Sequence, residues 1–187
     1  MNKKNKQTKV NGGFNIQPKR NGGFVSYTQP YNGGMIYAVA RVQEGDVFDE
    51  ERGKAVAFAK TELLIRKCEE RKALHVLDEM QCALRRELKK DPSADASRMW
   101  SKHISAAADY HKELLRYLRN QKRIVELVSE HYDSLGFMLT YTQALKAAHD
   151  QALAEEKARL EEEEKKKVSR RVTKAILDGD DGTAQNA

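Results

Sequence analysis

Long apolar runs, prolines and aromatic residues are scarce in this sequence. It has no run of about 18 apolar residues, which excludes a membrane-spanning helix, and its basic start leads into Asn-Gly-Gly rather than the apolar stretch of a secretory signal. Only 7% of the 187 residues are aromatic, three are proline and 33% are charged. This composition is typical of long, solvated helices that pack along narrow apolar seams.

Cysteine is also scarce, and its placement argues against a disulfide. Cys68 and Cys82 lie in one predicted helix, where a rise of about 1.5 Å per residue separates them by about 21 Å. A disulfide needs Cα atoms less than about 7 Å apart. We expect two free thiols that serve as small apolar side chains, and a cytoplasmic protein.

Acidic residues are absent from the first 43 positions, which carry seven basic residues. The other 27 basic residues are matched by all 28 acidic residues in 44–187, so the net charge of +6 originates in the N-terminal quarter. A basic arm on a nearly neutral body indicates a polyanionic partner, either nucleic acid or an acidic protein face. The alternative is a tail that only improves solubility.

The arm contains a short repeat, Asn-Gly-Gly, that begins at Asn11, Asn21 and Asn32. Asn and Gly tolerate positive φ and favour tight turns. Residues 24–28 and 35–42, which flank the third copy, are rich in β-branched and aromatic residues and predict one β-hairpin. The first copy lies in a polar, basic context, and we expect it to be disordered until a partner binds.

The rest of the chain predicts a helical body over 44–177, with helices at about 49–90, 92–133 and 137–177. Asp46 or Asp49 is expected to cap the first helix. Asp91-Pro92 separates the first two helices, which we expect to pair as an antiparallel hairpin, and Gly136 ends the second. The acidic residues 178–187 are expected to form a disordered tail.

The second helix carries a regular apolar stripe with a 4-3-4-3 spacing, which is typical of a coiled coil. The stripe consists of Trp100, Ile104, Ala107, His111, Leu114, Leu118, Gln121, Val125, Val128 and Tyr132. His111 and Gln121 interrupt it and are expected to fix its register against a partner helix. The stripe could be buried against another helix of this chain or against a second copy of the chain, which would give a homo-oligomer. The predicted fold class is therefore mainly α, a coiled-coil-like bundle of long antiparallel helices.

No motif in the sequence indicates an enzyme. The five histidines form no His-Glu-x-x-His motif, neither cysteine has a partner at metal-ligand spacing, and the Asn-Gly-Gly repeats lack the Lys-Ser/Thr ending of a phosphate-binding loop. The carboxylates Asp46, Asp49, Glu50 and Glu51 are explained by helix capping. We therefore predict a protein that binds rather than catalyses, without cofactor or metal.

Nucleic acid is the partner that the basic residues favour. Aromatic rings alternate with basic residues in the arm, and bases stack on such rings while Lys and Arg follow the phosphates. The predicted contacts are Lys3, Lys4, Lys6, Lys9, Lys19, Arg20, Phe24 and Tyr27. A second basic strip, on the second helix, consists of Arg116, Arg119, Lys122 and Arg123. The alternative for that strip is an ordinary solvated helix face.

Residues 36–60 include Tyr37-Ala38-Val39-Ala40-Arg41-Val42 and then Gly45-Asp46-x-Phe48-Asp49-x-x-x-Gly53-x-x-x-Ala57. This segment resembles small, mostly uncharacterised proteins of Firmicutes phages and mobile elements. The resemblance implies a strand, a tight turn and a helix that begins at Asp49, and it carries over no catalytic residue. Proteins of this size and lineage include anti-CRISPR proteins, which bind and block Cas nucleases.

Two functions are therefore expected from the sequence. The first is a non-enzymatic phage or mobile-element protein of the host cytoplasm that binds a nucleic acid or a nucleoprotein complex, such as a Cas nuclease with its guide RNA. The second is a structural or assembly protein, such as a phage scaffold, built on the stripe of the second helix and the charged helix after residue 154.

Overall fold

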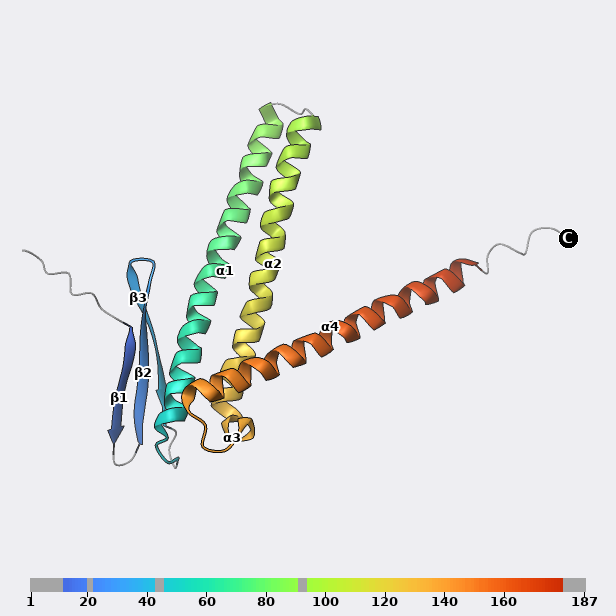
Figure 1. Ribbon diagram of the computed structural model, residues 1–187. Coiled ribbons are helices and arrows are strands. Elements are labelled where there is room, and N and C mark those ends of the chain that lie inside the picture. Colours follow the sequence, from blue (N-terminus) through green and yellow to red (C-terminus); the bar gives the residue numbers. More distant parts are fainter. Residues whose placement is uncertain (1–11, 20–21, 43–45, 91–93, 180–187) are drawn as a thin grey trace, which may run out of the picture.

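The computed structural model describes residues 12–19, 22–42, 46–90 and 94–179 (Figure 1). The described chain is mainly helical, as predicted, with an antiparallel sheet at its N-terminal end. The elements are β1 (Gly13–Lys19), β2 (Gly22–Tyr31), β3 (Gly34–Arg41), α1 (Glu50–Lys90), α2 (Ala94–Glu130), α3 (Tyr132–Leu135) and α4 (Tyr141–Gly179). None of these helices is apolar over a stretch long enough to cross a bilayer.

The sheet contains the predicted hairpin and one further strand. Strands β2 and β3 form the hairpin, whose turn has positive φ at Asn32 (50°) and Gly33 (78°), as a two-residue hairpin turn requires. The expectation of a single hairpin with a disordered first repeat is wrong for the residues described, because β1 pairs antiparallel with β2. Phe14 and Ile16 explain the extra strand, since both pack against the core.

Small residues let the sheet lie close to α1. Ala55, Ala57 and Ala59 are fully buried, and a Cβ on Gly53 would come within 2.6 Å of Val25 Cγ2. The Thr61 hydroxyl, also fully buried, lies 3.2 Å from the carbonyl oxygen of Tyr27 and 2.9 Å from that of Ala57. The arm therefore forms part of the core rather than an appendage to it.

Helices α1 and α2 run antiparallel as a long hairpin (Figure 1). The apolar stripe of α2 is buried over part of its length. Leu114, Leu118 and Val128 are buried, whereas Trp100, Ile104 and Val125 are half-buried. Both polar interruptions pair with α1: His111 Nε2 lies 3.0 Å from Glu70 Oε1, and Gln121 donates to the Ala59 carbonyl at 3.1 Å. The partner of the stripe is thus a helix of the same chain. The Asp91-Pro92 boundary lies outside the described residues.

The predicted helix boundaries need correction at both sides of Gly136. Helix α2 ends at Glu130 rather than 133, and α4 begins at Tyr141 rather than 137. Thr140 and Gln143 form a capping box: the Gln143 side chain accepts from the Thr140 N–H (3.0 Å), and the Thr140 hydroxyl accepts from the Gln143 N–H (3.4 Å). At the start of α1, the Asp49 carboxylate accepts from the Arg52 N–H at 3.0 Å, as predicted for the cap.

Helix α4 crosses the base of the hairpin and then leaves the body (Figure 1). Ala144, Ala148 and Ala152 are buried in the core, whereas every residue of 161–170 is exposed. In this stretch Glu162 pairs with Lys166 at i,i+4 (2.6 Å), and Glu164 pairs with Lys167 at i,i+3 (3.3 Å). The cysteines lie on one continuous helix, α1, and both are free.

Candidate nucleic-acid interface

The sheet has one face against α1 and one face toward solvent. On β3, Ala38 and Ala40 are buried whereas Tyr37 and Arg41 are exposed, and Tyr37 retains 65% of its surface. Phe24 of β2 pairs directly with Arg41 in the register and also with Gln17 of β1. Because directly opposed residues point to the same side of a sheet, Phe24, Arg41 and Gln17 share the outer face.

The chemistry of this outer face matches that of surfaces which bind single-stranded nucleic acid. Tyr37 and Phe24 offer rings for base stacking, and Arg41 offers a cation for a phosphate. The remaining outer positions described on β1 and β2 are small or polar, among them Asn15, Ser26 and Thr28. No carboxylate repels phosphate here, because residues 1–43 contain none.

Tyr27, predicted as a contact residue, and Phe14 are half-buried and pack against the core. Tyr27 packs between Phe14 (4.7 Å between ring centroids) and Phe58 (5.0 Å), and Phe14 also contacts Tyr141 at 5.2 Å. Burial, with the charge of Glu62, raises the pKa of Tyr27. These four rings join β1, β2, α1 and α4, so Tyr27 contributes to the core, whereas Phe24 is kept as a candidate stacking ring.

The basic residues predicted for the arm lie mostly beyond what the structure describes. Lys3, Lys4, Lys6, Lys9 and Arg20 fall in the undescribed ranges, and Lys19 is the last residue of β1. Their role stays a prediction from the sequence. The described chain begins at Gly12, directly before β1, which is an edge strand of the sheet. Residues 1–11 are therefore joined to the sheet that carries Tyr37 and Arg41.

The basic strip on α2 is largely neutralised by α4. Arg116 Nε lies 2.8 Å from Glu156 Oε1, and Arg123 binds both carboxylate oxygens of Glu155 at 2.7 and 3.0 Å. Arg119 and Lys122 are exposed and make no ion pair with another described residue. Half of the predicted strip therefore holds α4 in place, and only Arg119 and Lys122 offer unpaired charge.

Glu156 is the centre of this network. It is 6% exposed, and its carboxylate also accepts a short hydrogen bond from the Asn120 side chain. Burial alone would raise the pKa of Glu156, but the hydrogen bonds from Asn120 and Arg116 outweigh burial and lower that pKa. The hydrogen bond from Arg123 likewise lowers the pKa of Glu155. Both carboxylates are thus held ionised by α2.

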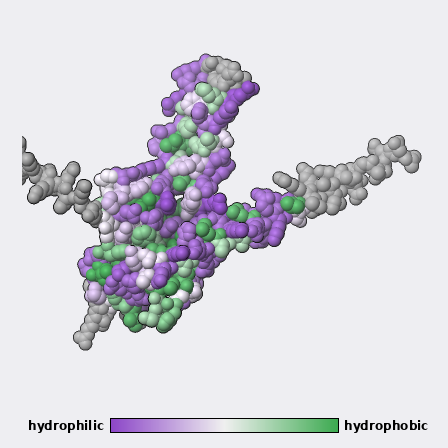
Figure 2. Space-filling view, viewed as in Figure 1, coloured by the Kyte–Doolittle hydropathy of each residue, from purple (hydrophilic) through white to green (hydrophobic). Residues whose placement is uncertain are grey.

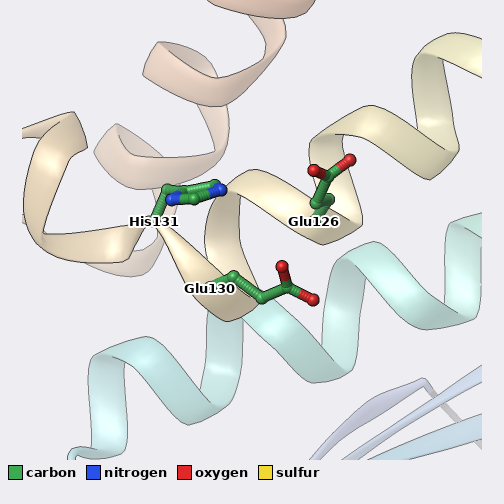
Figure 3. A group of neighbouring side chains, drawn as sticks. All are labelled: Glu126, Glu130 and His131. Carbon is green, nitrogen blue, oxygen red and sulfur yellow. The ribbon is translucent and has the colours of Figure 1, made fainter.

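Glu126, Glu130 and His131, at the C-terminal end of α2, lie close enough to share a metal ion (Figure 3). All three side chains are exposed, and Glu126 already pairs with Arg123 at 2.6 Å. Exposed carboxylates of this kind are common on helix surfaces, so the cluster does not by itself indicate a metal centre.

The sequence analysis did not select Tyr37 or Arg41 as contact residues. The alternation of residues 35–41 could have indicated them. Ala38 and Ala40 lie on one face of the strand, where small side chains allow close packing, so Tyr37 and Arg41 lie on the other face. No protein family, curated protein or solved structure matches this chain.

Proposed function

We propose that this protein binds single-stranded nucleic acid, alone or within a nucleoprotein complex, on the outer face of its sheet. The observation that carries the proposal is that exposed Tyr37, Phe24 and Arg41 share one face of the sheet, whose strands contain no carboxylate. The seven basic residues of the first 43 positions raise the rate of encounter with a polyanion.

The test measures binding of a fluorescently labelled single strand at several salt concentrations. Tyr37→Ala removes a stacking ring, and loss of one stacked base costs about 1–3 kcal/mol, or about 5- to 150-fold in affinity. Arg41→Ala removes one phosphate contact, which lowers the log–log salt slope by about 0.7. Tyr37→Ala should leave that slope unchanged, because stacking releases no counterions.

Tyr117→Ala is the matched control, because Tyr117 is also an exposed tyrosine (52%) but lies on α2. It should bind as the unmodified protein does. Equal affinities for Tyr37→Ala and Tyr117→Ala would rule out the sheet as the interface.

The resemblance of residues 36–60 to small phage proteins supports a narrower form of the proposal. In that form the protein inhibits a Cas nuclease by binding its complex with guide RNA. Cleavage of a target by guide-loaded nucleases should then slow when the protein is added, and Tyr37→Ala should relieve the inhibition. If every nuclease in a panel still cleaves its target fully, the inhibitor proposal is wrong, and nucleic-acid binding alone stays as the proposed function.

An assembly function is the second candidate, and the projecting part of α4 favours it. Residues 161–170 are exposed on all sides, and a helix that leaves its body is available to another chain. The apolar stripe of α2 no longer supports this candidate, because α1 covers it. Light scattering distinguishes the two: an oligomer that is stable at every salt concentration favours assembly.

A further inference from the structure

The far end of the α1–α2 hairpin carries an excess of basic residues. Residues 81–104 contain six basic and three acidic residues, a net charge of +3, whereas 44–187 as a whole carries −1. The chain returns on itself between α1 and α2, so the last turns of α1 and the first turns of α2 lie side by side there (Figure 1). We call this region the hairpin tip.

The basic side chains of the hairpin tip point to solvent. Arg85, Arg86 and Lys89 on α1 are exposed, as are Arg98 and Lys102 on α2, and none makes an ion pair with another residue whose side chain the structure describes. Lys90 alone is paired, with Glu87 at 3.2 Å. Figure 2 shows hydrophilic surface on both sides of the hairpin near this end. The arginines of the α2 strip differ, since Glu155 and Glu156 neutralise them.

The arrangement is unfavourable for the isolated chain. Arg85 and Lys89 are spaced i,i+4, as are Arg98 and Lys102, and like charges at this spacing destabilise a helix. The dipole of α1 favours Lys89 and Lys90 in its last turn, but no such effect supports Arg98 and Lys102, which lie beyond the first turn of α2. An anion bound across both helices would relieve the repulsion within the two i,i+4 pairs.

We propose that the hairpin tip is a second contact for the phosphate backbone of the same nucleic acid that the sheet binds, an inference that rests on the proposed function. The two surfaces are well separated. The sheet reaches α1 as far as Lys72, whose Nζ lies 5.1 Å from the ring centroid of Tyr31, and Lys72 precedes Arg86 by 14 residues of continuous helix, or about 21 Å. Only a strand that extends beyond the sheet reaches both.

The experiment compares a short strand of about 4 nucleotides, at the lower limit of the 4–16 nucleotides typical of one small binding surface, with a long one of about 30, well above that range. Arg98→Ala/Lys102→Ala should bind the short strand normally and the long strand about tenfold more weakly. Its salt slope with the long strand should be smaller by about 1.4, for two lost contacts to a single strand. Lys146→Ala/Lys157→Ala, which removes two exposed α4 charges that make no ion pair with another described residue, is the matched control.

Trp100 provides a local reporter, because it is the single tryptophan and lies between Arg98 and Lys102. Its fluorescence should change when the long strand binds and stay constant with the short one. A circular-dichroism melt confirms that each variant is folded. Equal long-strand affinity for the hairpin-tip variant and the α4 control would overturn the second contact, whereas a sheet variant would still lose affinity. Absence of binding by the unmodified protein would overturn both proposals.

Discussion

At the scale of single residues, close approach and buried charge dominate this fold. Gly53 lies inside α1, where helix propensity alone favours alanine by about 1 kcal/mol. Tertiary packing reverses that preference, because the methyl group would meet Val25 Cγ2 at 2.6 Å. The sequence pattern Gly53-x-x-x-Ala57 is therefore explained by the sheet that lies over it.

We predict that Gly53→Ala destabilises the protein by about 1–3 kcal/mol, the usual cost of overpacking, despite its better helix propensity. Val25→Ala in the same chain should recover part of that loss, since the two residues are in contact. Gly13→Ala is the control, because a Cβ there meets nothing within 4 Å. Chemical denaturation measures all three, and a Gly53→Ala protein more stable than the original would contradict the close approach.

A second prediction concerns the carboxylates that α2 holds ionised. The pKa values of Glu155 and Glu156 are lowered in the folded state, so their contribution is present above the unfolded pKa of about 4.3. It is lost as the pH falls through the lower, folded values. Glu156→Gln should cost about 1–3 kcal/mol at neutral pH, and this cost should shrink as the pH approaches 3.

Thermal melts at several pH values measure this effect. Glu130→Gln, which removes an exposed carboxylate outside the network, should show no comparable difference. A cost of Glu156→Gln that stays constant down to pH 3 would mean that the Arg116–Glu156 pair contributes little.

At the scale of elements, β1 shows how a polar strand becomes part of the core. Its sequence alternates Phe14 and Ile16 with Asn and Gln, and its apolar residues complete the inner face that β2 and β3 begin. Because Phe14 and Ile16 pack against the core, the helical body depends on part of the N-terminal segment.

We predict different outcomes for two N-terminal deletions. Removing residues 1–11 should leave the melting temperature unchanged, because β1 is retained. Removing residues 1–20 should cost less than about 6 kcal/mol but a measurable amount, because full burial is worth about 1.5–3 kcal/mol per side chain and Phe14 and Ile16 are partly buried. It also leaves the edge of β2 unpaired and prone to aggregation. Equal melting temperatures for the two deletions would show that β1 adds no stability.

At the scale of the whole molecule, the sheet packs with the start of α1, the end of α2 and the start of α4 to form a body (Figure 1). Two parts project from this body: the far half of the α1–α2 hairpin and the far half of α4. The hairpin holds itself together, because Leu77 and Leu114 are buried between its helices. The far half of α4 has no such partner within the described chain. Its i,i+3 and i,i+4 ion pairs each contribute about 0.2–0.5 kcal/mol.

We predict that a chain ending at Leu160 keeps its melting temperature, because residues 161–170 are exposed and add no core contacts. Its helical circular-dichroism signal should fall in proportion to the residues removed. Light scattering on both chains also tests the assembly function, which requires the shortened chain to lose an oligomer that the full chain forms. A lowered melting temperature would show that the projecting part packs on the body.

The sequence by itself determined the long helices, the hairpin turn at Asn32-Gly33 and the stripe from Trp100 to Val128. Each of these depends on local φ preferences or on a period within one element. Capping at Asp49 was also predictable, because its carboxylate accepts a hydrogen bond from the N–H of Arg52, only three residues away in the sequence.

Only the tertiary structure decided which charges are free and which rings are exposed. Arg116 and Arg123 resemble a free basic strip until Glu155 and Glu156, more than 30 residues away in sequence, are brought against them. Tyr27 and Tyr37 are similar residues on neighbouring strands, and one is in the core while the other is exposed, because α1 covers a single face of the sheet. The two-residue alternation of a strand divides its side chains between the two faces of the sheet, but it does not determine which face a distant helix covers.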